Sequence, residues 1–224
     1  YQVDVAWNLL YGFPGENLQD YRDTFKIVQA ISHLHPPMAY GYVGLHRFSP
    51  IFHAPEQFKL RRIRPLAAYK YLYPYPETVL ENLAYFFDFD FDGKEKTEYW
   101  FHPIKLEVEC WQQMTEHSRL EAIQRGRDPM VVRDTRPRRV RGEYRFNRLE
   151  AALVEFCDEP RTFPQIHQFL ATMTGDLGAD ESRLRGFLDW QVEHRLMLRM
   201  EERYLNLILL EPSQAQPAGA FWTR

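Results

Sequence analysis

An apolar run that ends in a glycine- and proline-containing turn is the feature that most constrains the fold of this chain. Residues 3–10 are mostly apolar, which is typical of a strand buried on both faces. Gly12, Pro14 and Gly15 then interrupt regular structure, and residues 17–34 have the periodicity of an amphipathic helix. Such a strand, turn and helix form one βα unit of an α/β domain. Ligands of these domains bind at the carboxyl ends of strands, so we expect this turn to border a binding site, although many such turns bind nothing.

The chain after this unit predicts a second strand and further alternating elements. Residues 38–48 are typical of a strand that lies parallel to the first, because a helix connects the two. A strand is also expected over 85–93, where apolar and acidic residues alternate. The remaining expectations are a short helix from Pro65 to Leu72, a helix over 77–84, a return strand over 97–101, and a long helix from Pro103 to about Arg125.

Three segments of the first half resemble a known enzyme family. They are Tyr11–Glu16 (YGFPGE), His33–Pro37 (HLHPP) and Leu45–Phe52 (LHRFSPIF). In this order they resemble the radical S-adenosylmethionine (radical SAM) maturases of ribosomally made peptides, many of which are cobalamin-dependent C-methyltransferases. The resemblance implies an α/β fold, the C-terminal part of a radical SAM partial TIM barrel. It also implies a precursor peptide as substrate, with C-methylation through cobalamin as one form of the modification.

The resemblance further implies which residues lie at the cofactor. Gly12, Phe13, Pro14, Gly15 and Glu16 are expected to shape the S-adenosylmethionine (SAM) pocket from one strand end, and Asn8 to contribute from the strand itself. His46, Arg47 and Ser49 are expected to border the pocket from the next strand end. No catalytic residue is predicted, because chemistry in this class belongs mainly to the cofactors.

The cysteines predict that part of such an enzyme lies outside this chain. Radical SAM enzymes hold a [4Fe–4S] cluster with a Cys-x3-Cys-x2-Cys loop, and this chain has only Cys110 and Cys157. No metal site is predicted at His33 and His35, which lack further ligands at a recognisable spacing. We therefore expect the cluster, and any cobalamin, to be bound by upstream residues, and this C-terminal portion to be inactive alone.

Two other functions stay open at this point. One is a different radical SAM enzyme, such as a tetrapyrrole cyclase or an RNA methylthiotransferase, because these enzymes share the Gly-Phe-Pro-Gly-Glu loop. The other is a non-enzymatic peptide-binding or regulatory protein.

The second half begins with an arginine-rich segment, 126–145. It is typical of a solvated linker or an edge strand, and the alternative is a cationic lip for an acidic peptide. Its arginines are Arg133, Arg136, Arg138, Arg139, Arg141 and Arg145.

The pattern that follows predicts a small α+β winged-helix-like module. Helices are expected over 148–157, 163–173 and 180–194, with a hairpin over 196–209. The third helix mixes acidic and basic residues, which does not favour DNA binding. Residues 142–170 resemble the peptide-binding modules that capture the leader of a precursor by adding a strand beside the third helix. A module that only packs against the barrel is the alternative.

These patterns divide the chain into four parts. They are the barrel part with its extension (1–102), a helix and arginine-rich linker (103–140), the winged-helix-like module (141–212) and a flexible tail (213–224). The formal net charge of −3 argues against a general nucleic-acid binder, and no apolar run reaches the length of a membrane span. Two lone cysteines fit a reducing compartment, so we expect a cytoplasmic protein. The resemblance implies a peptide as its partner, and we expect neither a nucleic acid nor a membrane.

Overall fold

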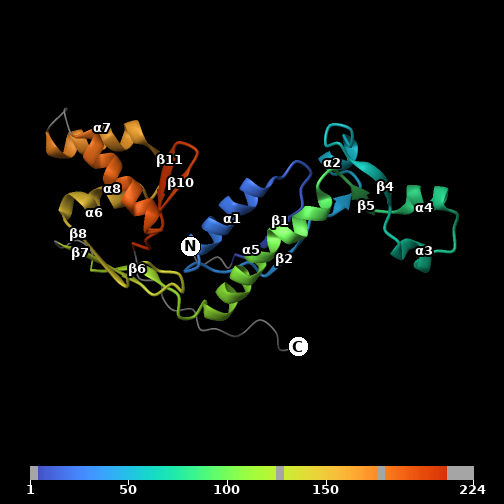
Figure 1. Ribbon diagram of the computed structural model, residues 1–224, viewed down its shortest axis with the longest axis horizontal. Coiled ribbons are helices and arrows are strands. Elements are labelled where there is room, and N and C mark those ends of the chain that lie inside the picture. The colour runs from blue at the N-terminus through green and yellow to red at the C-terminus, as the bar shows by residue number, and fades with distance from the viewer. Residues whose placement is uncertain (1–4, 125–128, 176–179, 211–224) are drawn as a thin grey trace. The chain divides into compact units, whose positions relative to one another are not determined.

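The computed structural model describes residues 5–124, 129–175 and 180–210 (Figure 1). Within these ranges the chain is a mixed α/β protein with eight helices and four small sheets, and the strands form no closed barrel. The chain separates into two compact units. The first consists of the chain up to Phe25 and Pro37–Val108, and the second of Lys26–Pro36 and the chain from Glu109 onward. The four-part division at 102, 140 and 212 stays a prediction.

The first unit begins with a parallel strand pair. Strand β1 (Asn8–Tyr11) is followed by helix α1 (Leu18–Ala30) and strand β2 (Ala39–Tyr42). Asn8 pairs with Ala39 and Tyr11 with Tyr42, in parallel. The predicted strand–helix–strand order is therefore confirmed. The helix ends at Ala30, before the expected position 34, and β1 is shorter than the apolar run, whose first two residues lie outside the described ranges.

The expected strand over 38–48 is wrong, because two strands in different sheets replace it. Val43 N–H makes the last bond to the first sheet, at the Tyr11 carbonyl (2.8 Å), and Gly44 follows. Strand β3 (Leu45–His46) then pairs antiparallel with β5 (Phe86–Asp90), and β4 (Arg61–Pro65) pairs with the other edge of β5. The strand predicted over 85–93 is thus confirmed, and Phe87 and Phe89 lie in its buried core.

Three short helices connect these strands. They are α2 (Pro50–His53), α3 (Ala68–Leu72) and α4 (Glu77–Leu83). The helix expected over 77–84 is confirmed, whereas the helix expected from Pro65 begins three residues later, because Pro65 ends β4.

Helix α5 (Lys94–Met114) corrects two predictions. Residues 97–101 are not a return strand, and Pro103 lies inside the helix instead of at its start. The physical reason is a buried stripe at helical spacing that crosses the proline. This stripe consists of Thr97, Phe101, Ile104, Val108 and Trp111. The predicted extension of this helix to Arg125 is also wrong, because β6 (Leu120–Gln124) forms there.

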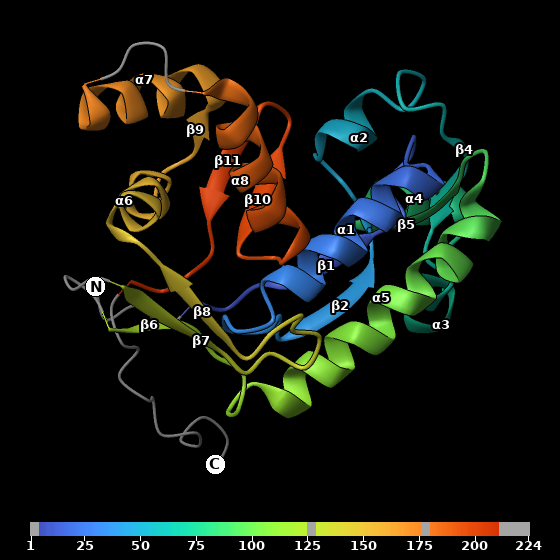
Figure 2. The ribbon, with the colours of Figure 1, turned by 60° about the vertical axis from the view of Figure 1, so that its left-hand side comes forward.

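The second unit contains an antiparallel sheet of β6, β7 (Met130–Asp134) and β8 (Glu143–Phe146), in that order (Figure 2). The arginine-rich segment therefore supplies two strands, and β8 lies at an edge of this sheet. Residues 126–128 of that segment lie outside the described ranges.

Helices and a hairpin complete the second unit. Helix α6 (Arg148–Phe156), strand β9 (Arg161–Thr162), helix α7 (Phe163–Thr174) and helix α8 (Glu181–Glu193) precede a hairpin of β10 (Met197–Met200) and β11 (Arg203–Asn206). The sheet order is β10-β11-β9. The predicted three helices and hairpin are confirmed as elements. The tail, 213–224, lies outside the described residues. No described helix is both long and apolar enough to cross a membrane.

Candidate functional site

The loop after β1 holds a backbone that glycine favours. Gly12 and Gly15 have φ angles of +82° and +98°, a region that residues with a Cβ rarely adopt. A Cβ on Gly12 would also lie 2.2 Å from Cε2 of Tyr42 on β2. A Cβ on Gly15 would meet nothing within 4 Å. Gly12 is therefore fixed by packing, whereas the backbone at Gly15 borders open space.

Glu16 and Tyr21 hold this loop closed. The Glu16 Oε2 atom accepts hydrogen bonds from Gly12 N–H (2.9 Å) and from the Tyr21 hydroxyl (2.5 Å). Gly12 N also lies 3.2 Å from Tyr21 Oη. Tyr21 on α1 is 5% exposed, and burial, together with the hydrogen bond to Glu16, raises the pKa of its hydroxyl well above the usual value. The phenol therefore remains a protonated donor at neutral pH.

The sequence pattern indicated Glu16 at this site but gave no role to Tyr21. The signal was an aromatic hydroxyl in the first turns of a helix just after an acidic residue. Glu16 itself was predicted at this site, and the structure gives it the role of tying the loop to α1. Phe13 is 37% exposed, and Pro14 is half-buried.

Tyr11 links the end of β1 to α5. Its ring stacks on Phe101, with centroids 3.9 Å apart, and its hydroxyl donates a hydrogen bond to the Glu98 carboxylate. Its edge also meets Tyr42, at 5.5 Å. Burial raises the pKa of Tyr11, so this hydroxyl also stays protonated at neutral pH. The face of β1 that carries Tyr11 is therefore packed against α5.

The opposite face of the parallel pair is not buried, which corrects the expectation of burial on both faces. Leu10 is 50% exposed, and Asn8 and Ala39, which form the first register pair, are both exposed. Asn8, the predicted strand contributor to the SAM pocket, thus lies on the uncovered face. No described element packs over it, so it lacks the second layer that a parallel sheet normally has.

The three residues predicted at the second strand end lie around β3, on a different sheet. Arg47 Nε donates to the Ala84 carbonyl (2.6 Å) and its guanidinium to the Glu81 carbonyl, so Arg47 caps the C-terminal end of α4. The Ser49 hydroxyl accepts from Phe52 N–H (3.2 Å) at the start of α2. His46 is exposed, and its ring lies against Tyr85 and Phe86. Arg47 and Ser49 therefore both have structural partners here.

The cavity beside the loop is too small for a nucleoside. It is lined by residues of β1, α1 and α5, including Tyr11, Glu16, Tyr21 and Phe101, and its volume is about 30 Å³. That is room for about one water molecule. The described residues also contain no group of three or more His, Cys, Asp or Glu side chains that could hold a metal ion.

No protein-family model, curated protein or solved structure matches this chain. Its function is therefore argued from its own residues and from the resemblance of its motifs.

The second unit has its own candidate site, at the outer edge of β8. Asp134 N–H donates to the Gly142 carbonyl (3.0 Å), which makes these residues a hydrogen-bonded pair. By the alternation of an antiparallel ladder, Tyr144 and Phe146 also bond to β7. The N–H and C=O groups of Glu143 and Arg145 then face outward. No strand pairs with this edge in the part of the chain that the structure describes.

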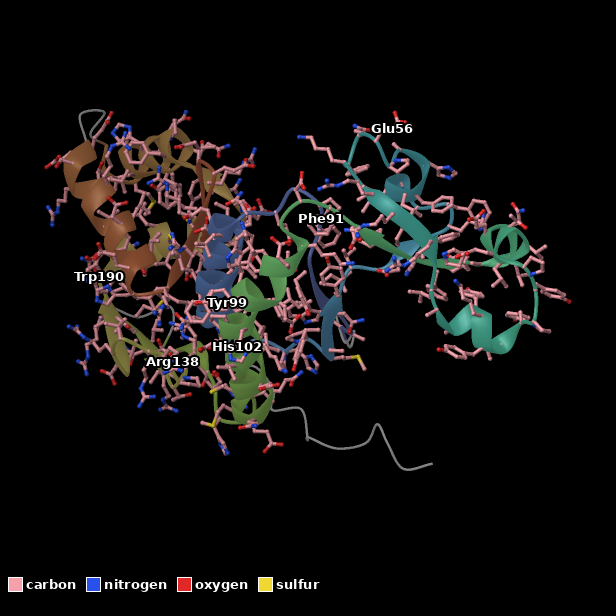
Figure 3. The ribbon with its side chains drawn as sticks, turned by 45° about the vertical axis from the view of Figure 1, so that its right-hand side comes forward. Glu56, Phe91, Tyr99, His102, Arg138 and Trp190 are labelled. Carbon is pink, nitrogen blue, oxygen red and sulfur yellow. The ribbon has the colours of Figure 1, made fainter. Side chains whose placement is uncertain are left out.

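Two aromatic side chains of α8, Trp190 and Phe187, contact β8. Trp190, labelled in Figure 3, meets the rings of Tyr144 (5.9 Å) and Phe146 (6.3 Å) edge-on. Phe187 also lies 6.4 Å from Phe146. Trp190 and Phe187 are half-buried, so each keeps part of its surface exposed. Arg139, Arg141 and Arg145 near β8 are exposed.

Proposed function

We propose that this chain is the C-terminal part of a radical SAM enzyme that modifies a ribosomally synthesised precursor peptide. The proposal includes C-methylation through cobalamin as one outcome. It rests on the YGFPGE, HLHPP and LHRFSP resemblance and on one structural observation, the parallel pair β1–β2 that is covered on one face only.

The exposed face of the β1–β2 pair supports the proposal that this pair is part of a barrel wall. In a barrel of parallel strands, helices cover the outer face and side chains of other strands fill the inside. Here α1 and α5 pack on the face of Leu9 and Tyr11. The face of Asn8 and Leu10 is exposed, and further strands of the same barrel would cover it.

The residues at the strand end fit one wall of a SAM site but not the iron–sulfur cluster. The open space at Gly15 leaves its backbone accessible to a ligand, and the exposed Phe13 offers a ring beside it. Gly12 N–H is already used by Glu16, so its role is to shape the loop. The cluster has no ligands here, because the chain's two cysteines are far apart in sequence. When bound in enzymes of this class, SAM and the cluster supply a 5′-deoxyadenosyl radical.

We also propose that the second unit is a winged-helix module that captures an extended peptide by strand addition. The order of three helices and a hairpin, with β9 paired to the hairpin, is that of a winged helix. The outward N–H and C=O groups of Glu143 and Arg145 would pair with the peptide backbone. Side chains on the inner face of the added strand would meet Trp190 and Phe187, and acidic side chains would meet the exposed arginines.

The open edge of β8 also favours the second candidate, a non-enzymatic peptide-binding protein. Reading the gene upstream separates the two functions. A Cys-x3-Cys-x2-Cys loop within the preceding ~150 residues, about one domain's length, supports the enzyme. With no such loop upstream, the enzyme proposal fails and the binding protein remains.

A biochemical test uses the full-length protein, reconstituted with iron and sulfide under anaerobic conditions. We expect SAM cleavage that increases when the short peptide encoded beside the gene is added. A protein that binds no iron–sulfur cluster and cleaves no SAM would contradict the proposal.

A further inference from the structure

A second cavity of the first unit lies where the pairing between β3 and β5 stops. Its volume is about 150 Å³. Leu45 and His46 pair with Phe87 and Phe86, and one step further along the ladder Gly44 would face Asp88. That pairing is not made, and the residues on both sides of the gap line the cavity, together with Leu66 and Lys94.

The walls of this cavity are apolar and its charges are paired. Val43, Leu45 and Phe89 are buried side chains of the wall. Lys94 Nζ lies 3.3 Å from an Asp88 carboxylate oxygen and 3.6 Å from one of Asp90, and it donates to the Phe89 carbonyl. Asp88 is also bound by Arg64 (2.6 Å). An ionic ligand would therefore have to break existing ion pairs, whereas a neutral apolar group would not.

The mouth of the cavity also has apolar residues. Leu66 and Phe86 line it and are 39% and 44% exposed. Gly44 is exposed and adds no side chain to the wall, and a Cβ there would lie 2.8 Å from His46 Nε2. Exposed apolar side chains around an apolar hollow are typical of a binding surface.

Tyr42 connects this cavity to the loop after β1. Tyr42 lines the cavity, and its ring is the group that a Cβ on Gly12 would strike. A group bound in the cavity would thus lie beside a residue that also contacts the loop that we propose to border SAM.

We propose that this cavity is a subsite for one leucine-sized side chain of the peptide substrate, close to the residue that is modified. The size fits, because apolar cavities of about 150 Å³ hold a benzene-sized molecule. The assignment of the ligand to a substrate peptide rests on the proposed function, whereas the preference for a neutral apolar side chain follows from the cavity walls.

The test measures binding of N-acetyl-L-leucinamide to the isotopically labelled 224-residue chain by NMR. N-acetylglycinamide, which lacks the side chain, and N-acetyl-L-aspartic acid 1-amide, whose side-chain carboxylate carries a charge, are the control ligands. We expect saturable shifts at residues 42–45, 66 and 86–89 with a millimolar dissociation constant for the leucine amide alone. Equal shifts with the glycine amide, or no binding of the leucine amide, would overturn the proposal.

Matched variants locate the binding. Leu66→Trp fills the mouth, and we expect it to weaken binding by more than about tenfold, because burial of a leucine side chain contributes at least that factor. Leu83→Trp, at an exposed apolar position on α4 outside the cavity, should bind as the wild type does. Phe86→Trp, at the other exposed apolar residue of the mouth, is the second variant if Leu66→Trp does not fold. Unchanged binding by the folded cavity variant would contradict the subsite.

Failure of the subsite and failure of the proposed function give different results. Amide binding needs no SAM, so binding by a protein that cleaves no SAM would keep the subsite and remove the enzyme. SAM cleavage without amide binding would keep the enzyme and remove the subsite.

Discussion

Arg136 shows what a single residue contributes to the second unit. It is 1% exposed, and its guanidinium pairs with the equally buried Asp134 at 2.9 and 2.7 Å. Its remaining nitrogen donates to the carbonyls of Ala30 (2.6 Å) and Arg195 (2.7 Å). Arg136 thereby joins the end of α1 to the residues after α8. The sequence predicted this arginine as part of a solvated linker or edge strand, or of a cationic lip, and that is wrong for Arg136 because its side chain is buried. The Ala30 and Arg195 carbonyls that it binds are distant in sequence, so no local pattern indicates them.

Replacing Arg136 should destabilise the chain strongly. Arg136→Met leaves the Asp134 carboxylate buried without its partner, which costs about 3–5 kcal/mol. Arg141→Met, at an exposed position, should change the free energy of unfolding by less than about 0.5 kcal/mol. Urea denaturation measures both. Equal stabilities of the two variants would show that the buried pair does not hold the unit together.

His33 should make stability fall in mild acid. Burial first, and Arg136 second, lower the pKa of His33 to about 3. Its Nε2–H donates to the Leu207 carbonyl (2.9 Å), and burial keeps the imidazole neutral in the folded state. Below the ordinary pKa near 6.5 the unfolded state binds a proton that the folded state does not. Stability is therefore full above that pH and is lost as the pH falls from about 6.5 toward 3.

A comparison with His33→Gln isolates this effect. The slope for one such group is about 1.4 kcal/mol per pH unit. We expect the stability advantage of the wild type over His33→Gln to shrink at about that slope between pH 6 and 4. An advantage that does not change with pH would mean that His33 is protonated in the folded state.

Tyr21 should stabilise the loop after β1 through its hydroxyl. Tyr21→Phe removes the donor to the Glu16 carboxylate and should cost about 1–2 kcal/mol, since a hydrogen bond to a charged group is involved. Tyr71→Phe, at a position that is 89% exposed, is the control and should be neutral. Chemical denaturation measures the free energy of unfolding of both variants. An unchanged stability of Tyr21→Phe would show that the Tyr21 hydroxyl does not stabilise the loop.

At the scale of elements, local signals decided which predictions succeeded. Helices α6, α7 and α8 begin after Asn147, Thr162 and Asp180, which are residue types that commonly cap the N-terminus of a helix. The bounds of these helices lie within one or two residues of the predicted ones. The predicted start of α5 was wrong because Pro103 was interpreted as the first residue of the helix. Thr97, Phe101 and Ile104 already showed helical spacing. The prediction of one strand over 38–48 was wrong because the partner of β3, which is β5, lies forty residues away.

The edge of β8 gives a prediction at this scale. Arg145→Pro removes one outward N–H and should abolish peptide binding by strand addition, while no bond to β7 is lost. Arg145→Ala keeps that N–H and removes only the side chain, so it should bind an acidic peptide a few-fold more weakly. Fluorescence anisotropy with the labelled peptide encoded beside the gene measures both. Strand addition is refuted if the proline variant, still folded, binds as well as the alanine variant.

At the scale of the whole molecule, the unit to which residues 26–36 belong could not be predicted from the sequence. Residues 26–36 belong to the second unit, although residues on both sides of them belong to the first. Their assignment depends on long-range contacts, such as the bond between Arg136 and the Ala30 carbonyl. Local turn chemistry predicted a loop at Gly12, Pro14 and Gly15, whereas the assignment of Gly12–Glu16 to a SAM pocket came from the resemblance and stays a prediction. The roles of Arg47 and Ser49 as caps depend on their contacts with α4 and α2.

The central claim is that β1, its loop and β2 form part of the wall of a SAM-binding barrel. Formation of 5′-deoxyadenosine by the anaerobically reconstituted full-length protein tests it most directly, with Gly12→Ala as the variant, because the added Cβ would strike the Tyr42 ring. We predict that the wild type forms 5′-deoxyadenosine and that the variant, with its cluster intact, forms at least about tenfold less, the loss expected when a site is misplaced by about 1 Å. Undiminished 5′-deoxyadenosine from the folded variant, or none from the wild type, would contradict the claim.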